Sequence, residues 1–167
     1  MKPVVERLEF GKNNFSKWIH LVFLVLCIAA FFLSLDRTDN TVWYAVAGIL
    51  LFGGIYLTTV KYRIVTDQDG FIISELFRQR TIGWKDVTAL KYEIVYHGKG
   101  GAELKLKILY GSPGKKHEIS VKQFNKQKMQ RFFEMLNEQC ENASKNEHFV
   151  KQATGEMKSW KEQLKMY

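Results

Sequence analysis

Histidine and cysteine are the residues that most often bind metals or act as nucleophiles, and in this chain they are widely separated. The histidines are His20, His97, His117 and His148. None stands at the short distance from another histidine or a cysteine that a zinc site requires. Cys27 falls in an apolar segment and Cys140 on a predicted helical face, so we expect neither a metal site nor a disulfide.

Motifs for nucleophilic or phosphate chemistry are also missing from the sequence. There is no G-x-S-x-G, and the acidic residues are scattered along predicted strand faces. The segment HGKGG, residues 97–101, lacks the spacing and the strand-to-helix context of a phosphate-binding loop, so we predict a hairpin loop. Trp84 precedes a predicted turn and is expected to be a core residue rather than a stacking platform. We therefore expect no enzyme and no cofactor.

Positive charge forms the clearest chemical pattern. The chain has 25 Lys and Arg against 17 Asp and Glu, a net charge of +8. If the strands predicted below alternate in direction, six basic residues gather at one end of the folded part without acidic neighbours. These candidate contacts are Lys61, Arg63, Arg78, Arg80, Lys99 and Lys122. The opposite end is balanced, with Asp67, Asp69 and Asp86 against Lys85, Lys115 and Lys116. Such a polarised domain suits anionic lipid headgroups, although a chain this basic also gains basic turns by chance.

Two apolar blocks without charged side chains, residues 18–35 and 42–60, are each long enough to cross about 30 Å of hydrocarbon. The polar turn between them predicts an antiparallel helical hairpin. We expect four small residues to let the helices approach closely: Ala30, Ser34, Gly54 and Thr58. A cleaved signal peptide is the alternative for the first block, but a long preface containing Glu6 and Glu9 disfavours it.

Basic residues beside the blocks predict the orientation of this hairpin. Basic residues precede the first block (Lys2, Arg7, Lys12 and Lys17) and follow the second (Lys61 and Arg63), whereas the short turn has only Arg37 against two aspartates. Because lysine and arginine accumulate on the cytoplasmic side, both termini are expected to be cytoplasmic.

After residue 61 the pattern changes to short alternating strands separated by turns. Six strands are predicted, at residues 62–66, 71–77, 80–84, 87–96, 102–110 and 116–121. A helix follows, with Asn125 as its N-cap and Phe124 and Met129 forming a hydrophobic staple. Its apolar stripe consists of Met129, Phe132, Phe133, Leu136 and Cys140. An antiparallel sheet closed by this helix would bury that stripe.

We expect four regions along the chain. They are a cytoplasmic segment at residues 1–17, the hairpin at 18–60, a folded domain at 61–142 and a polar tail at 143–167. In the tail, Met157, Trp160 and Leu164 recur at helical spacing beside lysines, which is consistent with either a short amphipathic helix or a disordered end.

The two blocks followed by YRIVTDQDGFIISELFRQRTIGWKDVTALKYE resemble the membrane-anchored bacterial pleckstrin-homology-like (PH-like) domains. In these domains a strand pair with a DG-type turn precedes an I-x-W-x-D-[IV] corner, formed here by Ile82, Trp84, Asp86 and Val87. The resemblance covers about residues 61–142. It implies an antiparallel β-sandwich or partly open barrel of six or seven strands, capped by a C-terminal α-helix.

Two departures from the wider pleckstrin-homology class bear on function. The turn DQDG is acidic where phosphoinositide-binding members are basic, and the tryptophan of the closing helix is missing, with Phe132 and Phe133 in its neighbourhood. Phosphoinositide recognition by the usual pocket is therefore not expected.

Together these features predict an α+β, multi-pass protein of the bacterial inner (cytoplasmic) membrane. We expect a non-enzymatic binding or scaffold module that recognises a protein segment, by β-augmentation at an exposed sheet edge, or anionic headgroups. The alternative is an enzyme or enzyme accessory that acts on lipid or envelope precursors. A nucleic-acid partner is not expected, because the basic groups are predicted to face lipid. The sequence leaves the oligomeric state open.

Overall fold

The computed structural model describes residues 7–35, 40–96, 101–112 and 114–157. The chain is α+β and divides into two compact units. The hairpin unit comprises Gly11–Arg63 and Ile73–Gln79. The sheet unit comprises the described residues of Met1–Phe10, Ile64–Ile72 and Arg80–Tyr167.

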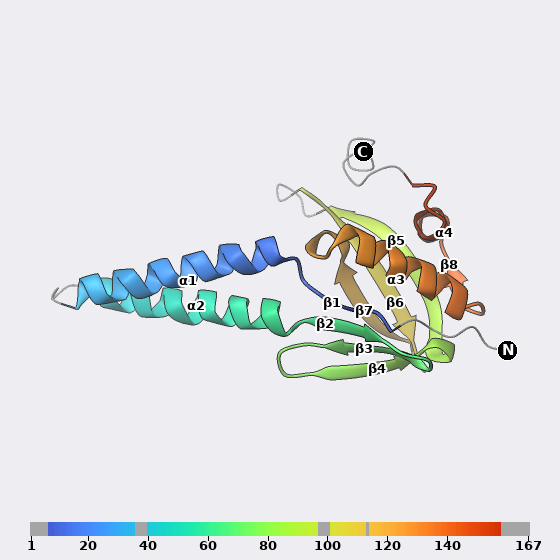
Figure 1. The fold of residues 1–167 in the computed structure, drawn as a ribbon, viewed down its shortest axis with the longest axis horizontal. Helices are drawn as coiled ribbons and strands as arrows, with labels where there is room; N and C mark the ends of the chain where they lie inside the picture. Colours follow the sequence, from blue (N-terminus) through green and yellow to red (C-terminus); the bar gives the residue numbers. More distant parts are fainter. Residues whose placement is uncertain (1–6, 36–39, 97–100, 113, 158–167) are drawn as a thin grey trace. The chain divides into compact units, whose positions relative to one another are not determined.

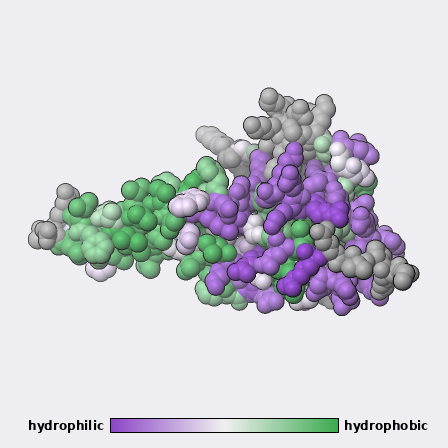
Figure 2. Space-filling view, viewed as in Figure 1, coloured by the Kyte–Doolittle hydropathy of each residue, from purple (hydrophilic) through white to green (hydrophobic). Residues whose placement is uncertain are grey.

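Two apolar helices form most of the hairpin unit (Figure 1). They are α1 (Asn14–Ser34) and α2 (Thr41–Lys61), each of 21 residues, with mean hydropathies of 2.1 and 1.6 over their most apolar windows. Both are long and apolar enough to cross a membrane, and Figure 2 shows an almost continuous hydrophobic surface over them. This confirms the predicted pair of apolar helices, with α1 starting four residues earlier than its apolar block.

The helices pack closely at positions other than those predicted. A Cβ atom added to Gly48 would lie 2.8 Å from the Sγ of Cys27, and the rings of Phe23 and Phe52 stack with centroids 5.1 Å apart. Beside Gly54, a Cβ would meet no described atom within 4 Å. The prediction for Gly54 is therefore wrong. Its cause is that small residues occur on every side of these helices, and the spacing alone does not say which side faces the partner helix.

The other predicted small residues give a mixed result. Ser34 is buried as expected, but Ala30 and Thr58 are exposed, and Thr59 is buried in place of Thr58. One residue along a helix turns the side chain by about 100°, which is enough to exchange the buried and the exposed position.

The strands form two four-stranded sheets. The first has the order β1-β2-β3-β4, formed by β1 (Glu9–Gly11), β2 (Arg63–Thr66), β3 (Gly70–Ser74) and β4 (Gln79–Gly83). The second has the order β7-β6-β5-β8, formed by β5 (Val87–Tyr96), β6 (Ala102–Tyr110), β7 (Lys115–Ser120) and β8 (Ser144–Lys145). Its neighbours pair antiparallel except β5 and β8, which are parallel. All six predicted strands exist, as β2 to β7.

Strand β3 is shorter than the second predicted strand. We expected it to run over residues 71–77 with a turn at 78–79, but β3 ends at Ser74 and β4 begins at Gln79. The backbone N–H of Glu75 donates to the carbonyl of Arg78 at 2.7 Å, so Leu76 and Phe77 form the tip of the hairpin. Apolar residues at this tip continue the alternation of the strand, and the pattern therefore conceals the turn.

The strand β1 was not predicted, because it is short and precedes the helices. The N–H of Thr66 donates to the carbonyl of Leu8 at 2.9 Å, and the N–H of Leu8 donates to the hydroxyl of Thr66 at 2.8 Å. Phe10 is buried, with its ring 5.6 Å from those of Phe124 and Phe132. The described residues up to Phe10 therefore belong to the sheet unit, and Phe10 is part of its core.

The main helix of the sheet unit is α3 (Lys126–Gln139), and its cap was predicted correctly. The side chain of Asn125 accepts hydrogen bonds from the N–H groups of Gln127 and Lys128. The stripe residues of α3 are buried, and Trp84 is also buried, as expected for a core residue. Trp84 lies in a 3-10 turn, η1 (Trp84–Asp86), and a second such turn, η3 (Val121–Gln123), precedes α3.

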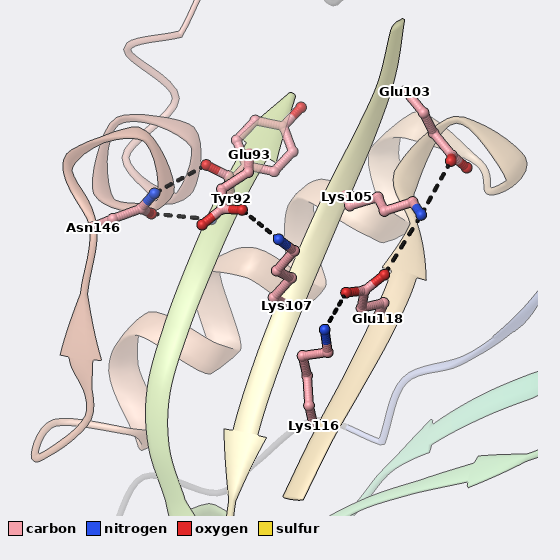
Figure 3. Close-up of polar contacts among 8 residues, drawn as sticks. All are labelled: Tyr92, Glu93, Glu103, Lys105, Lys107, Lys116, Glu118 and Asn146. Carbon is pink, nitrogen blue, oxygen red and sulfur yellow. Dashed lines mark hydrogen bonds and ion pairs between the residues drawn. The ribbon is translucent and has the colours of Figure 1, made fainter. Parts of the chain in front are cut away.

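The chain continues in ordered structure beyond the predicted domain, through β8 and α4 (Glu147–Ala153). Asn146, between them, accepts a hydrogen bond from the N–H of Tyr92 and donates one to the carbonyl of Tyr92, both at 3.0 Å (Figure 3). The region predicted as a polar tail is therefore attached to β5. Of the predicted amphipathic stripe, Trp160 and Leu164 lie outside the described residues.

Candidate functional site

The outward face of the second sheet carries charged side chains that pair with one another (Figure 3). Lys105 lies 3.4 Å from Glu103 and 3.5 Å from Glu118, and Lys116 lies 2.8 Å from Glu118. The hydrogen bond from Lys116 lowers the pKa of Glu118, as expected when a cation stabilises a carboxylate. Because each of these charges has a neighbour of opposite sign, this face offers little net charge to a ligand.

A different arrangement occurs in the hairpin unit, where a shallow recess has a volume of about 400 Å³. Its lining comes from three parts of the chain: the segment before α1, the end of α2 and the β3–β4 turn. The lining residues are Lys12, Thr58, Tyr62, Glu75, Leu76, Phe77 and Arg78. Two cations and an exposed apolar tip therefore meet where the apolar helices end.

Lys12 is held against an aromatic ring in this recess. Its Nζ lies 5.4 Å from the centroid of the Tyr62 ring, within the range of a cation–π interaction. Gly11 allows the approach, since a Cβ at this position would lie 2.9 Å from the carbonyl oxygen of Tyr62. Burial lowers the pKa of the Lys12 ammonium. In the sequence, Lys12 contributes only to the predicted orientation, although its position between a glycine and an apolar block is a signal for such a contact.

The structure describes five of the six predicted basic residues, and three of these belong to the hairpin unit. Lys61 ends α2, Arg63 begins β2 and Arg78 follows the turn tip, so these three belong to the hairpin unit, and all three are exposed. Arg63 also interacts with another group of the chain. The arrangement brings Lys61, Arg63 and Arg78 into one compact body with Lys12.

The remaining predicted residues belong elsewhere. Arg80 and Lys122 are part of the sheet unit, and Lys99 lies outside the described residues. The Nζ of Lys122 donates to the carbonyl of Ala102 at 3.0 Å, which places it beside the start of β6. Arg80 is half-buried and also has an interaction partner within the chain.

The predicted grouping of the opposite turns agrees with the register within the sheet unit. The N–H of Trp84 donates to the carbonyl of Asp69, and the N–H of Gly111 donates to the carbonyl of Asp86, both at 3.0 Å. Lys115 pairs with Tyr110 at the same end of the second sheet. These turns therefore lie together, away from the end that contains Ala102 and Lys122.

Comparison with known proteins assigns neither a family nor a function to the chain. No family model matches the chain, and neither the curated proteins nor the solved structures include a significant match. Within the part of the chain that the structure describes, no group of three or more His, Cys, Asp or Glu side chains could hold a metal ion. The resemblance to PH-like domains remains a prediction.

Proposed function

We propose that this chain is a non-enzymatic module anchored in the bacterial inner membrane by α1 and α2, with a PH-like domain on the cytoplasmic side, and that it contacts anionic lipid headgroups. The observation that carries the proposal is the composition of the hairpin unit, in which two lipid-compatible helices end in a group of cations. Leu33 and Trp43, for example, are 80% and 72% exposed. Apolar surface of this extent is unfavourable in water and favourable in hydrocarbon.

Polar groups within the helices support the same environment. The hydroxyl of Ser34 donates to the carbonyl of Phe31 at 2.9 Å, and the hydroxyls of Thr58 and Thr59 donate to the carbonyl of Ile55 at 2.7 and 2.8 Å. These internal hydrogen bonds satisfy groups that could not find water in a bilayer.

Aromatic residues at the ends of the helices fit a bilayer in the same way. Trp43 and Tyr44 lie in the first turn of α2, and Tyr62 directly follows its last turn. Tyr44 and Tyr62 are 18 positions apart, a rise of about 27 Å along a helix. Aromatic side chains that combine an apolar ring with a polar tip prefer the two interfaces of a membrane, which are separated by a similar distance.

The pairing of β1 with β2 supports two spans and termini on one side. Leu8 precedes α1 and Thr66 follows α2, yet their backbones are hydrogen-bonded to each other. A single crossing would separate these two segments by the bilayer. The excess of basic residues beside the outer ends of the helices supports the cytoplasmic side for both.

Headgroup contact is proposed for Lys61, Arg63, Arg78 and Lys12. A cation near an anionic membrane surface contributes about 1 kcal/mol, an attraction that salt weakens. For Arg80, Lys99 and Lys122, headgroup contact remains a prediction from the sequence.

The test uses the full chain in vesicles of phosphatidylcholine and phosphatidylglycerol. Insertion is measured first, as resistance to extraction at alkaline pH. Selectivity for the anionic lipid is then measured with spin-labelled phosphatidylglycerol and phosphatidylcholine at the protein boundary. The double variant K61Q/R78Q should lose most of the preference for phosphatidylglycerol, whereas K91Q/K115Q, with the same loss of charge on exposed residues of the sheet unit, should retain it. Equal loss in both variants would contradict a specific contact at the hairpin unit.

A further inference from the structure

The β3–β4 turn has an unusual composition for its geometry. Two-residue hairpin loops favour glycine, asparagine or aspartate, which tolerate the backbone angles of the turn and interact well with water. Here the loop is Leu76-Phe77, and no described residue other than glycine has a positive φ. Phe77 is 90% exposed, the highest value among the large hydrophobic side chains that the structure describes. Neither turn chemistry nor packing within the chain accounts for a phenylalanine at this position.

The position of the turn indicates what covers it. Although β2 and a turn separate β3 and β4 from α2, Ile73–Gln79 belongs to the compact unit of the helices. Leu76 and Phe77 line the same recess as Thr58 and Tyr62, which lie at the end of α2. In a membrane, the end of an apolar helix marks the boundary between acyl chains and headgroups. The exposed ring of Phe77 therefore lies at this depth.

Charged neighbours of the turn suit the same boundary. Arg78 directly follows Phe77 and is exposed, and Lys12 contributes a second cation to the recess. Side chains of this kind keep an apolar stem in the interface while the cation contacts phosphate. An apolar pair flanked by cations is the composition that binds the surface of an anionic bilayer.

We propose that the Leu76-Phe77 tip inserts into the headgroup–acyl boundary of the leaflet beside α2, as an anchor additional to the two helices. Arg78 and Lys12 then contact lipid phosphates above the tip. The inference rests on the proposed function, because it requires α1 and α2 to span a bilayer. It adds a third point of attachment, which restrains the β3–β4 hairpin at the membrane surface.

The experiment places a fluorescent probe on single cysteines of the full chain in phosphatidylcholine–phosphatidylglycerol vesicles. Cys27→Ala removes the half-buried native thiol, and the same chain without a new cysteine shows whether buried Cys140 takes up probe. Probes are attached at Phe77→Cys, at Gln68→Cys in the exposed β2–β3 turn and at Leu26→Cys on the exposed side of α1. Quenching by lipids with a nitroxide near the headgroup, or near the end of the acyl chain for the probe at residue 26, is compared with quenching by aqueous iodide.

The probe at residue 77 should be quenched several-fold more by the nitroxide lipid, and several-fold less by iodide, than the identical probe at residue 68. A second measurement keeps the tip apolar and attaches the probe at Leu76→Cys. Adding Phe77→Asp should then reduce lipid quenching several-fold, whereas Phe77→Leu should preserve it. This pair separates the effect of Phe77 from the lipophilicity of the probe.

The three sites separate the possible failures. If the probe at residue 26 is not quenched by lipid, the helices do not span the bilayer and the proposed function fails. If residue 26 is quenched but residue 77 behaves like residue 68, only the inserted tip is refuted. Protection from iodide without lipid quenching, together with disulfide cross-linking between Phe77→Cys chains, would show that a second copy covers the tip and would also overturn the inference.

Discussion

At the scale of single residues, Asn146 joins two parts of the sheet unit that are 54 positions apart. Its side chain pairs with both backbone groups of Tyr92 and also accepts a hydrogen bond from the N–H of Phe149 at the start of α4. The amide thus pairs with the backbone of β5 as a neighbouring strand would, and it also caps α4. The amide makes these bonds from two separate atoms, because its oxygen accepts from Tyr92 and Phe149 while its nitrogen donates to Tyr92.

We expect Asn146→Ala to lower the free energy of unfolding by about 2–4 kcal/mol, because a helix cap is lost and two backbone groups of Tyr92 lose their partner. Asn146→Asp retains the cap and the acceptor but loses the donor, so its effect should be smaller. Thermal unfolding in detergent micelles, with hydrogen exchange at the Tyr92 amide, measures both. If the Tyr92 amide exchanges no faster in either variant than in the wild type, the Asn146 side chain does not protect β5.

Cys140 should make stability depend on alkaline pH. Burial raises the pKa of its thiol to about 12 from an ordinary value of 9.0. Between these values the thiol ionises in the unfolded chain and stays protonated in the folded one, so the folded state is disfavoured as the pH rises. Relative to Cys140→Ala, the wild type should lose up to about 1.4 kcal/mol per pH unit above pH 9. Parallel pH curves for the two proteins would contradict this.

At the scale of elements, the contact between α1 and α2 depends on Gly48. Replacement by isoleucine must displace Cys27, and overpacking of this kind costs about 1–3 kcal/mol. Gly54→Ile makes the same chemical change where no described atom lies within 4 Å, and it should be tolerated. Thermal unfolding of both variants in the same detergent compares them directly. Equal effects would mean that the glycines matter for the helix itself and not for the contact.

Elements with strong local signals could be predicted from the sequence. Three signals depend on neighbouring residues alone: the long charge-free blocks within α1 and α2, the Asn125 cap and the alternation in β6. Strand β1 and the partners of Gly48 depend on contacts between distant segments, which no local pattern contains. The turn at Leu76-Phe77 was missed for a different reason, since its residues follow the apolar pattern expected of a strand.

The same distinction applies to the candidate site. Charge and strand direction are sufficient to predict Lys61, Arg63 and Arg78. The contact between Lys12 and Tyr62 could not be predicted in this way, because it exists only after α1 and α2 return the chain to its starting point. The apolar part of the site was missed together with the turn that presents it.

At the scale of the whole molecule, the sheet unit contains residues from before α1 as well as residues from after α2. Phe10 and Leu8 precede α1, yet both contribute to the sheet unit. We expect a fragment that begins at residue 62 to be unstable, because it lacks these contacts. Loss of the Phe10 side chain alone should cost about 3–5 kcal/mol.

A second fragment provides the control. Joining residues 7–12 to residue 62 through a short flexible linker, without α1 and α2, should restore cooperative unfolding. Circular dichroism and thermal unfolding of both fragments, and of the linked fragment with Phe10→Ala, distinguish the outcomes. If the fragment lacking residues 7–12 is as stable as the linked one, β1 is not required for the fold.

The pairing of β1 with β2 also determines the order of events during synthesis. A ribosome releases Leu8 well before Thr66, and the two are 58 positions apart. On the proposed topology, β1 would have no partner until both α1 and α2 had crossed the membrane, and the ring of Phe10 would stay in water until then. Completion of the first sheet would therefore report correct threading of the nascent chain, and a chain with one misplaced crossing would keep an open strand edge that proteases and chaperones can detect.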